Sequence, residues 1–68
     1  MGKNVWVSPD IDGWKVHREG EINGKVYPTK EKAVSVGISM GRQEASELTI
    51  QRKDGVIQEK RSYKKRSR

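Results

Sequence analysis

The chain has 68 residues, no cysteine and a formal net charge of +6. A chain of this length has room for one small core, and without cysteine neither disulfides nor thiolate metal sites can reinforce it. The N-terminal residues hold no apolar run long enough for a signal peptide or a membrane span, so we expect a cytoplasmic protein that makes no membrane contact. Self-association, as in a homodimer, is the remaining way to bury more surface.

The excess positive charge lies at the C-terminal end. Six of the 15 Lys and Arg residues fall between Lys60 and Arg68, a stretch without any acid, and the other nine are balanced by the nine acidic residues. We therefore predict a formally neutral domain over residues 1–63 and a basic, solvated tail over residues 64–68. A neutral domain with a cationic end suggests a polyanionic partner.

Two strands are expected at the N-terminal end. Apolar residues alternate with polar or aromatic neighbours over Asn4–Ser8 and again over Trp14–Glu19, which is the period of half-buried strands. The residues between them are turn formers, with Pro9 fixing φ and Gly13 free to adopt a positive φ. The two strands should therefore form an antiparallel hairpin, and Gly20–Gly24 then breaks the pattern.

A helix should follow, beginning near Lys30. Thr29 can cap this helix through its hydroxyl, and Glu31 suits the positive end of the helix dipole. The apolar positions recur at steps of three and four residues and are mostly small, which predicts a narrow face that can lie close to a sheet. These positions are Ala33, Val34, Gly37, Ile38, Gly41 and Ala45.

Two more strands are expected over Glu47–Lys53 and Val56–Arg61, joined by Asp54-Gly55, a strong hairpin signal. A two-residue turn would put Ile57 on the core face of the sheet, whereas a bulged turn would put Val56 there, and the sequence leaves both open. The predicted fold is α+β, in the order ββαββ, with an antiparallel four-stranded sheet and one helix packed on one face.

Four stretches of the chain, taken in order, carry a resemblance to a known family. They are Val5-Trp6-Val7-Ser8-Pro9, Asp12-Gly13-Trp14-Lys15-Val16, the helix start Thr29-Lys30-Glu31-Lys32-Ala33, and the closing run from Asp54 to Tyr63. Together they resemble a small prokaryotic and phage family, domain of unknown function 2188. The resemblance covers roughly residues 4–63 and implies the fold above and a bacterial or bacteriophage origin. It implies no catalytic or binding residue, and residues 64–68 extend past the family's usual end.

The sequence lacks the parts of an enzyme site. His17 is the single histidine and reads as a surface residue, cysteine is absent, and the acids are scattered, so neither a catalytic triad nor a metal-assisted hydrolase is predicted. Asp10 and Asp12 share a turn, but a calcium loop needs a further oxygen ligand where Trp14 stands. The glycines follow no phosphate-binding pattern. We therefore expect a non-enzymatic protein with no metal and no cofactor.

The basic end is the strongest functional signal. Its cations can neutralise phosphates by displacing counterions, an attraction that depends strongly on salt and not on sequence, and one tyrosine ring could stack on a base. The alternative is a terminus that only keeps a small domain soluble. The predicted contacts with DNA or RNA are Lys60, Arg61, Tyr63, Lys64, Lys65, Arg66 and Arg68.

The alternation in the strands also predicts two different sheet faces. The face toward the helix should hold Val5, Val7, Trp14, Val16, Leu48 and Ile50, and the opposite face Trp6, Lys15, His17, Thr49, Gln51 and Lys53. The second set mixes an aromatic ring with cations and amides, which suits nucleic-acid stacking, a polar protein interface, or plain contact with water. The candidate contacts on this face are Trp6, Lys15, His17, Gln51 and Lys53.

Two functions from different classes are compatible with these signals. The leading hypothesis is a non-enzymatic nucleic-acid-binding accessory protein, whose tail contacts phosphates with little sequence specificity. The alternative is a protein-interaction module or homodimeric modulator, which a phage could encode. In that case Trp6 would be the anchor of the interface and the tail would be incidental.

Overall fold

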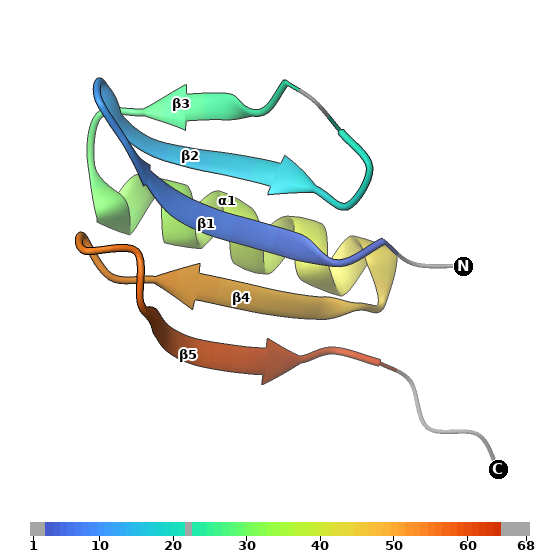
Figure 1. Cartoon of the computed structure of the whole chain (residues 1–68). Helices are drawn as coiled ribbons and strands as arrows, with labels where there is room; N and C mark the ends of the chain where they lie inside the picture. The colour runs from blue at the N-terminus through green and yellow to red at the C-terminus, as the bar shows by residue number, and fades with distance from the viewer. Residues whose placement is uncertain (1–2, 22, 65–68) are drawn as a thin grey trace, which may run out of the picture.

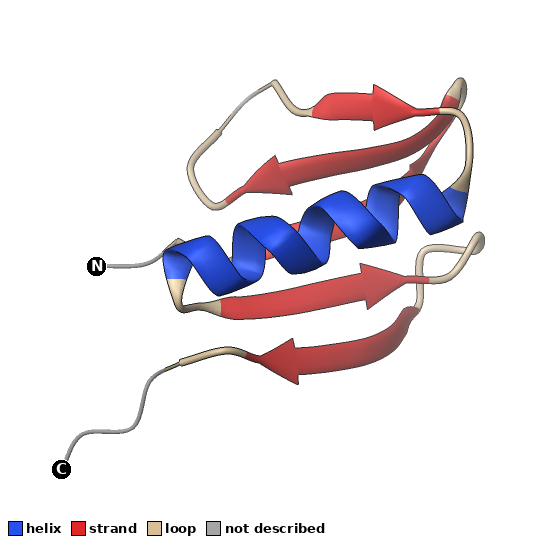
Figure 2. Cartoon of the chain, turned by 180° about the vertical axis from the view of Figure 1, so that it is seen from behind, coloured by secondary structure: helices blue, strands red, loops and turns tan. Residues whose placement is uncertain are grey.

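A computed structural model describes residues 3–21 and 23–64. Over these residues one helix packs on one face of a single five-stranded sheet, and the other face of the sheet is open (Figures 1 and 2). The elements in chain order are β1 (Val5–Asp10), β2 (Gly13–Arg18), β3 (Lys25–Tyr27), α1 (Lys30–Glu44), β4 (Glu47–Gln51) and β5 (Ile57–Ser62). No helix in this part of the chain is long and apolar enough to cross a membrane.

The sheet has the strand order β3-β2-β1-β4-β5, and all neighbours are antiparallel except β1 and β4, which are parallel. The α+β class is confirmed, but the predicted four-stranded antiparallel sheet is wrong: the sheet is five-stranded and mixed. The reason is the path of α1, which connects β3 to β4 and passes over one face of the sheet (Figure 2). β4 therefore arrives beside β1 and runs in the same direction, as parallel neighbours joined by a crossover do.

The strand β3 was missing from the sequence prediction, so the observed order is βββαββ. It has three residues and pairs with β2, with Val26 opposite Lys15. Three residues cannot display a clear period-two pattern, and β3 lies between Gly24 and Pro28, which read as loop residues.

The first hairpin is confirmed, with longer strands than expected. Asp10 pairs with Gly13, so the turn contains only Ile11 and Asp12, and Pro9 belongs to β1. Gly13 has a φ of +141°, as its place in the turn predicted. The Asp12 amide donates a hydrogen bond to the Asp10 carboxylate, 3.1 Å away.

The helix begins and ends at well-formed caps. The Thr29 hydroxyl accepts a hydrogen bond from the Lys32 amide at 3.2 Å, which confirms its predicted role. At the other end Ala45 is left-handed, with a φ of 52°, and the Ser46 amide donates to the Gly41 carbonyl at 3.1 Å. This closing pattern satisfies carbonyl groups that the last turn would otherwise leave free.

The core lies between α1 and the three central strands. Its buried apolar side chains are Val5, Val7, Val16, Ala33, Leu48 and Ile50, with Trp14 and Tyr63 among the partly buried residues packed against it. The predicted close approach of the helix is confirmed, because a Cβ on Gly37 would lie 2.9 Å from Val7 Cγ2 and 3.0 Å from Leu48 Cδ1. Only a residue without a side chain lets the helix come this near.

The second hairpin follows neither of the two turns considered. The Arg52 amide donates to the Val56 carbonyl at 2.7 Å, Gly55 has a φ of +88°, and a bulge lies between Ile50 and Gln51. Ile57 then pairs with Gln51, on the face away from the helix. Val56 and Ile57 are 53% and 51% exposed, so neither joins the core.

Candidate functional site

The open face of the sheet carries the side chains that alternate with the core. Across the strands, His17 pairs with Trp6, Trp6 with Thr49, and Thr49 with Lys60, so these four residues form one row. A second row holds Val26, Lys15 and Ser8 on one side and the pair Gln51 and Ile57 on the other. We call this surface the outer face: Trp6, Ser8, Lys15, His17, Val26, Thr49, Gln51, Ile57 and Lys60.

The centre of the outer face is an aromatic pair. The rings of Trp6 and His17 are nearly parallel, at 14°, and their centroids are 5.7 Å apart. Rings in full face-to-face contact would be closer, since carbon atoms touch at about 3.5–4.0 Å. The pair is therefore offset, and each ring leaves part of its surface free of the other.

The surroundings of His17 disfavour the charged form of its imidazole. Its pKa is lowered from the ordinary value of 6.5, first because burial removes water from the charged ring and second because Lys15 repels it, while Glu21 acts in the opposite direction. Its Nδ1 is buried and has no hydrogen-bond partner among the described residues. The prediction of a plain surface residue was therefore incomplete, because Trp6 covers part of this ring.

The lowered pKa of His17 predicts a dependence of stability on pH. The unfolded chain binds the proton at about 6.5, more readily than the folded chain, so the free energy of unfolding should fall as the pH drops through 6.5 toward the lowered pKa. Urea titrations at about pH 7.5 and about pH 5.5 measure this fall. His17→Gln should remove it, since His17 is the single histidine.

Two carboxylates affect the pH dependence of stability in a more acidic pH range than His17 does. Hydrogen bonds lower the pKa values of Glu44 and Asp54 from their ordinary 4.5 and 3.8, chiefly from the Lys3 amide in the first case and from the Arg52 side chain in the second. Their stabilising contribution is lost only at more acid pH. If the free energy of unfolding changed equally with pH in the wild type and in His17→Gln above about pH 5.5, the role given to His17 would be contradicted.

A groove of about 440 Å³ runs along the outer face, beside the aromatic pair. Its lining side chains include Trp6, Ser8, His17, Glu19, Glu21 and Gln51. Glu21 is engaged locally, because its carboxylate accepts a hydrogen bond from the Arg18 amide at 3.0 Å. Glu19 is exposed, and no described residue donates a hydrogen bond to its carboxylate.

Three of the groove residues, Ser8, Glu19 and Glu21, were absent from the sequence prediction. Ser8 and Glu19 stand two residues from Trp6 and His17, so strand alternation puts them on the same face. Strand alternation in the sequence is therefore the signal that could have found both residues. For Glu21, which lies beyond the end of β2, no comparable periodic signal exists.

The predicted cationic contacts do not form one surface. Lys60 lies on the outer face opposite Thr49, whereas Arg61 lies opposite Leu48, on the helix side, where its Nε is 2.6 Å from a Glu59 carboxylate oxygen. That hydrogen bond raises the pKa of the Arg61 guanidinium. Lys64 is 3.9 Å from the Glu47 carboxylate. The predicted contacts Lys65, Arg66 and Arg68 lie outside the described residues.

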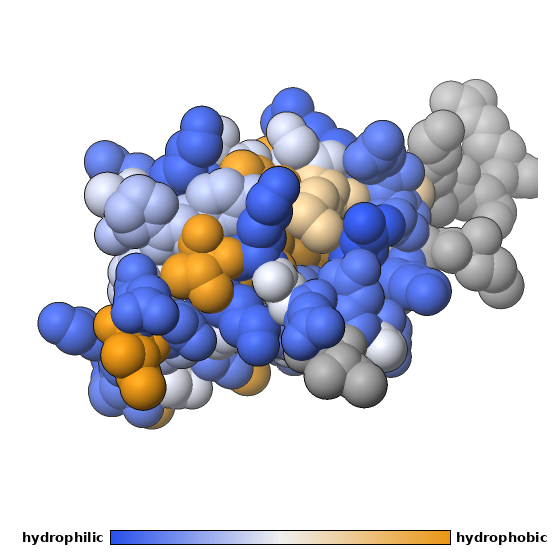
Figure 3. Space-filling view, turned by 90° about the horizontal axis from the view of Figure 1, so that it is seen from above, coloured by the Kyte–Doolittle hydropathy of each residue, from blue (hydrophilic) through white to orange (hydrophobic). Residues whose placement is uncertain are grey.

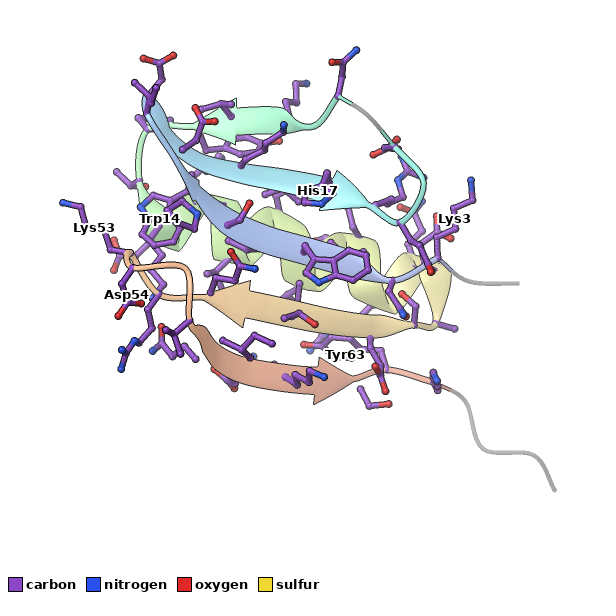
Figure 4. All side chains as sticks on the ribbon, viewed as in Figure 1. Lys3, Trp14, His17, Lys53, Asp54 and Tyr63 are labelled. Atoms are coloured by element: carbon purple, nitrogen blue, oxygen red, sulfur yellow. The ribbon has the colours of Figure 1, made fainter. Side chains whose placement is uncertain are left out.

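Two other predicted contacts also lie away from the outer face. Lys53 belongs to the turn after β4 and not to the strand, so it sits at the end of the sheet far from His17 (Figure 4). Tyr63 packs on the helix side: a Cβ on Gly41 would lie 2.9 Å from its ring, and the Arg42 guanidinium is 5.8 Å from the ring centroid. Its ring is therefore not beside Trp6.

The surface seen from the β3 edge is hydrophilic over most of its area, with small and separate apolar patches (Figure 3). Among residues 3–21 and 23–64, no three His, Cys, Asp or Glu side chains are grouped in a way that could hold a metal ion. The outer face brings together aromatic, cationic and carboxylate groups.

A match to a family model assigns the chain to a family, and the match covers nearly all of the chain. A family model described as an uncharacterized protein conserved in bacteria, DUF2188, matches residues 5–63. The chain belongs to DUF2188. The match confirms the resemblance carried by the motifs between Val5 and Tyr63, and the groove of this DUF2188 member lies wholly within the matched residues, whereas Lys64 lies beyond them. No curated protein and no solved structure matches the chain.

Proposed function

We propose that this DUF2188 protein is a non-enzymatic nucleic-acid-binding accessory protein of the cytoplasm, which holds a single strand on its outer face. The observation that carries the proposal is the Trp6 and His17 pair, set on an open sheet between Lys15 and Lys60. Aromatic rings on an exposed sheet offer a stacking surface for unpaired bases, and neighbouring lysines attract the phosphates between them.

The phosphate contacts are assigned to the cations nearest this face. Neither Lys15 nor Lys60 is within 4.0 Å of an acidic group of the described residues, whereas Arg61 is already paired with Glu59. Lys64, Lys65, Arg66 and Arg68 follow Tyr63 in the chain, and we assign further phosphate contacts to them. Binding through these groups should depend strongly on salt.

Deleting residues 64–68 should weaken binding to single-stranded DNA or RNA and flatten its salt dependence, because four Lys or Arg residues are lost. For single strands each lost phosphate contact lowers the slope of log K against log salt by about 0.7. Anisotropy titrations of a labelled oligonucleotide at several salt concentrations measure this slope. An unchanged slope would exclude the tail from the interface, and an absence of binding by the full chain at low salt would exclude the proposed function.

A matched pair of point variants completes this experiment. Lys60→Gln removes one cation from the outer face. The slope of log K against log salt should therefore fall by about 0.7, which corresponds to one phosphate contact. Lys32→Gln removes an exposed cation from α1, on the opposite side of the sheet, and should leave binding unchanged. Equal losses in both variants would mean that net charge alone drives the attraction.

A second function, a protein-interaction module or homodimer, is favoured by one observation. The outer face has an apolar residue at each edge, with Val26 on β3 and Ile57 on β5 exposed to 42% and 51%. If this face binds a protein, Trp6→Ala should abolish the complex and leave the salt-dependent binding of nucleic acid unchanged. If it binds a strand, Trp6→Ala should weaken that binding by about tenfold.

A further inference from the structure

The groove beside Trp6 has a chemical asymmetry that the proposed function does not use. Toward the turn end of β1 and β2 it is bordered by Ser8. Toward the other end it is bordered by the carboxylate of Glu19, whose backbone amide donates to the Asn4 carbonyl at 2.7 Å. Lys60 pairs with Thr49 on the β5 side of Trp6, whereas Glu19 follows β2 on the other side, so a cation and a carboxylate flank Trp6.

This charge distribution orients a bound nucleotide. Phosphates are attracted to Lys60 and repelled by Glu19, so we expect the backbone of a strand to lie on the β5 side of Trp6 and the base to point toward the carboxylate. Glu19 is the first residue after β2 and lines the same groove as Trp6 and His17. This placement lets a base stack on Trp6 while its outer edge reaches the carboxylate.

A carboxylate can only accept hydrogen bonds, which limits the base that fits. Glu19 is exposed and receives no hydrogen bond from the described residues, so both of its oxygens are available to a ligand. Guanine offers two adjacent donors on its Watson–Crick edge, the N1 hydrogen and the 2-amino group. Adenine and cytosine place an acceptor beside their amino group, and thymine and uracil place acceptors on both sides of a single donor.

We propose that the groove selects an unpaired guanine, which stacks on Trp6 and donates two hydrogen bonds to the Glu19 carboxylate. This inference rests on the proposed function, since it names the base that the single strand presents to the outer face. It adds a preference at one nucleotide to an otherwise non-specific attachment. A base that turned an acceptor toward Glu19 would leave its own edge unpaired and face a negative charge, which is the source of the discrimination.

The test compares labelled oligothymidines of about eight nucleotides that differ only at one central position. A single guanine avoids the self-association of guanine-rich strands. We expect the strand with guanine to bind about tenfold more tightly than the strands with adenine, cytosine or thymine at that position. Inosine, which lacks the 2-amino group, should fall between guanine and the other bases.

Two variants test the role of the carboxylate. Glu19→Gln replaces one acceptor by a donor, so it should reduce the guanine preference to less than about twofold while oligothymidine binds as before or slightly better. Glu31→Gln removes an exposed carboxylate from α1, on the other side of the sheet, and should change neither quantity. A guanine preference that persists in Glu19→Gln would overturn the assignment of Glu19.

The outcomes separate this inference from the function on which it rests. Equal binding of all the strands by the wild type, with the salt dependence intact, would overturn the guanine site and leave the nucleic-acid function standing. An absence of binding to every strand at low salt would overturn the function itself. A preference for guanine that is lost in Glu19→Gln and kept in Glu31→Gln would support both.

Discussion

We expect Leu48→Ala to leave much of the protein unfolded at room temperature. Leu48 is fully buried in β4. Its Cδ1 lies 3.0 Å from the position that a Cβ on Gly37 would occupy, so the helix packs directly against its side chain. Truncating a buried leucine costs about 2–5 kcal/mol, and a domain of this size seldom has more than about 3–5 kcal/mol of stability. A urea titration followed by circular dichroism measures the loss.

The matched control for this substitution is Ile11→Ala. Ile11 lies in the turn between β1 and β2 and is 100% exposed, so the same kind of truncation removes no buried surface there. Its free energy of unfolding should change by less than about 0.5 kcal/mol. If Leu48→Ala proved as stable as Ile11→Ala, the helix could not be packed on the sheet as described.

We expect the second large effect from Gly13→Ala, at the start of β2. A Cβ there would lie 2.1 Å from the Tyr27 carbonyl oxygen, and the φ of +141° disfavours any residue other than glycine. A positive φ costs about 1–2 kcal/mol for alanine, and forcing β2 and β3 apart adds about 1–3 kcal/mol, as overpacking does elsewhere. The total of about 2–5 kcal/mol can be measured by the same titration.

Gly20→Ala separates these two contributions. Gly20 also has a positive φ, +87°, but nothing lies within 4 Å of the position its Cβ would take. It should therefore show only the backbone cost of about 1–2 kcal/mol. Equal losses for the two variants would mean that Gly13 does not approach Tyr27 closely, and would contradict the pairing of β3 with β2.

Much of the core could be predicted, because its signals are local. The alternation around Val5, Val7 and Leu48 depends only on the pleat of a strand, and the cap at Thr29 depends on a hydroxyl three residues before an amide. The fifth strand and the parallel pairing of β1 with β4 could not be predicted in this way. They depend on where α1 crosses the sheet, which is a contact between segments far apart in the chain.

In the candidate site too, the positions that depend on local strand alternation could be predicted, and those that depend on tertiary contacts could not. Alternation correctly put Trp6, Lys15, His17 and Gln51 on one face, since each lies within a regular strand. It failed for Lys53, because a bulge and an early turn end β4 at Gln51.

The amino-acid sequence by itself determined the residues that alternate into the core, the start of the helix at Lys30 and the concentration of positive charge after Glu59. Each of these follows from interactions or counts within a few neighbouring residues. The tertiary structure decided that His17 lies against Trp6, that Glu19 borders the same groove, and that Lys60 and Arg61 lie on opposite faces of the sheet. Strand pairing sets these positions, because it brings together side chains from separate segments, and no local pattern specifies which segments will pair.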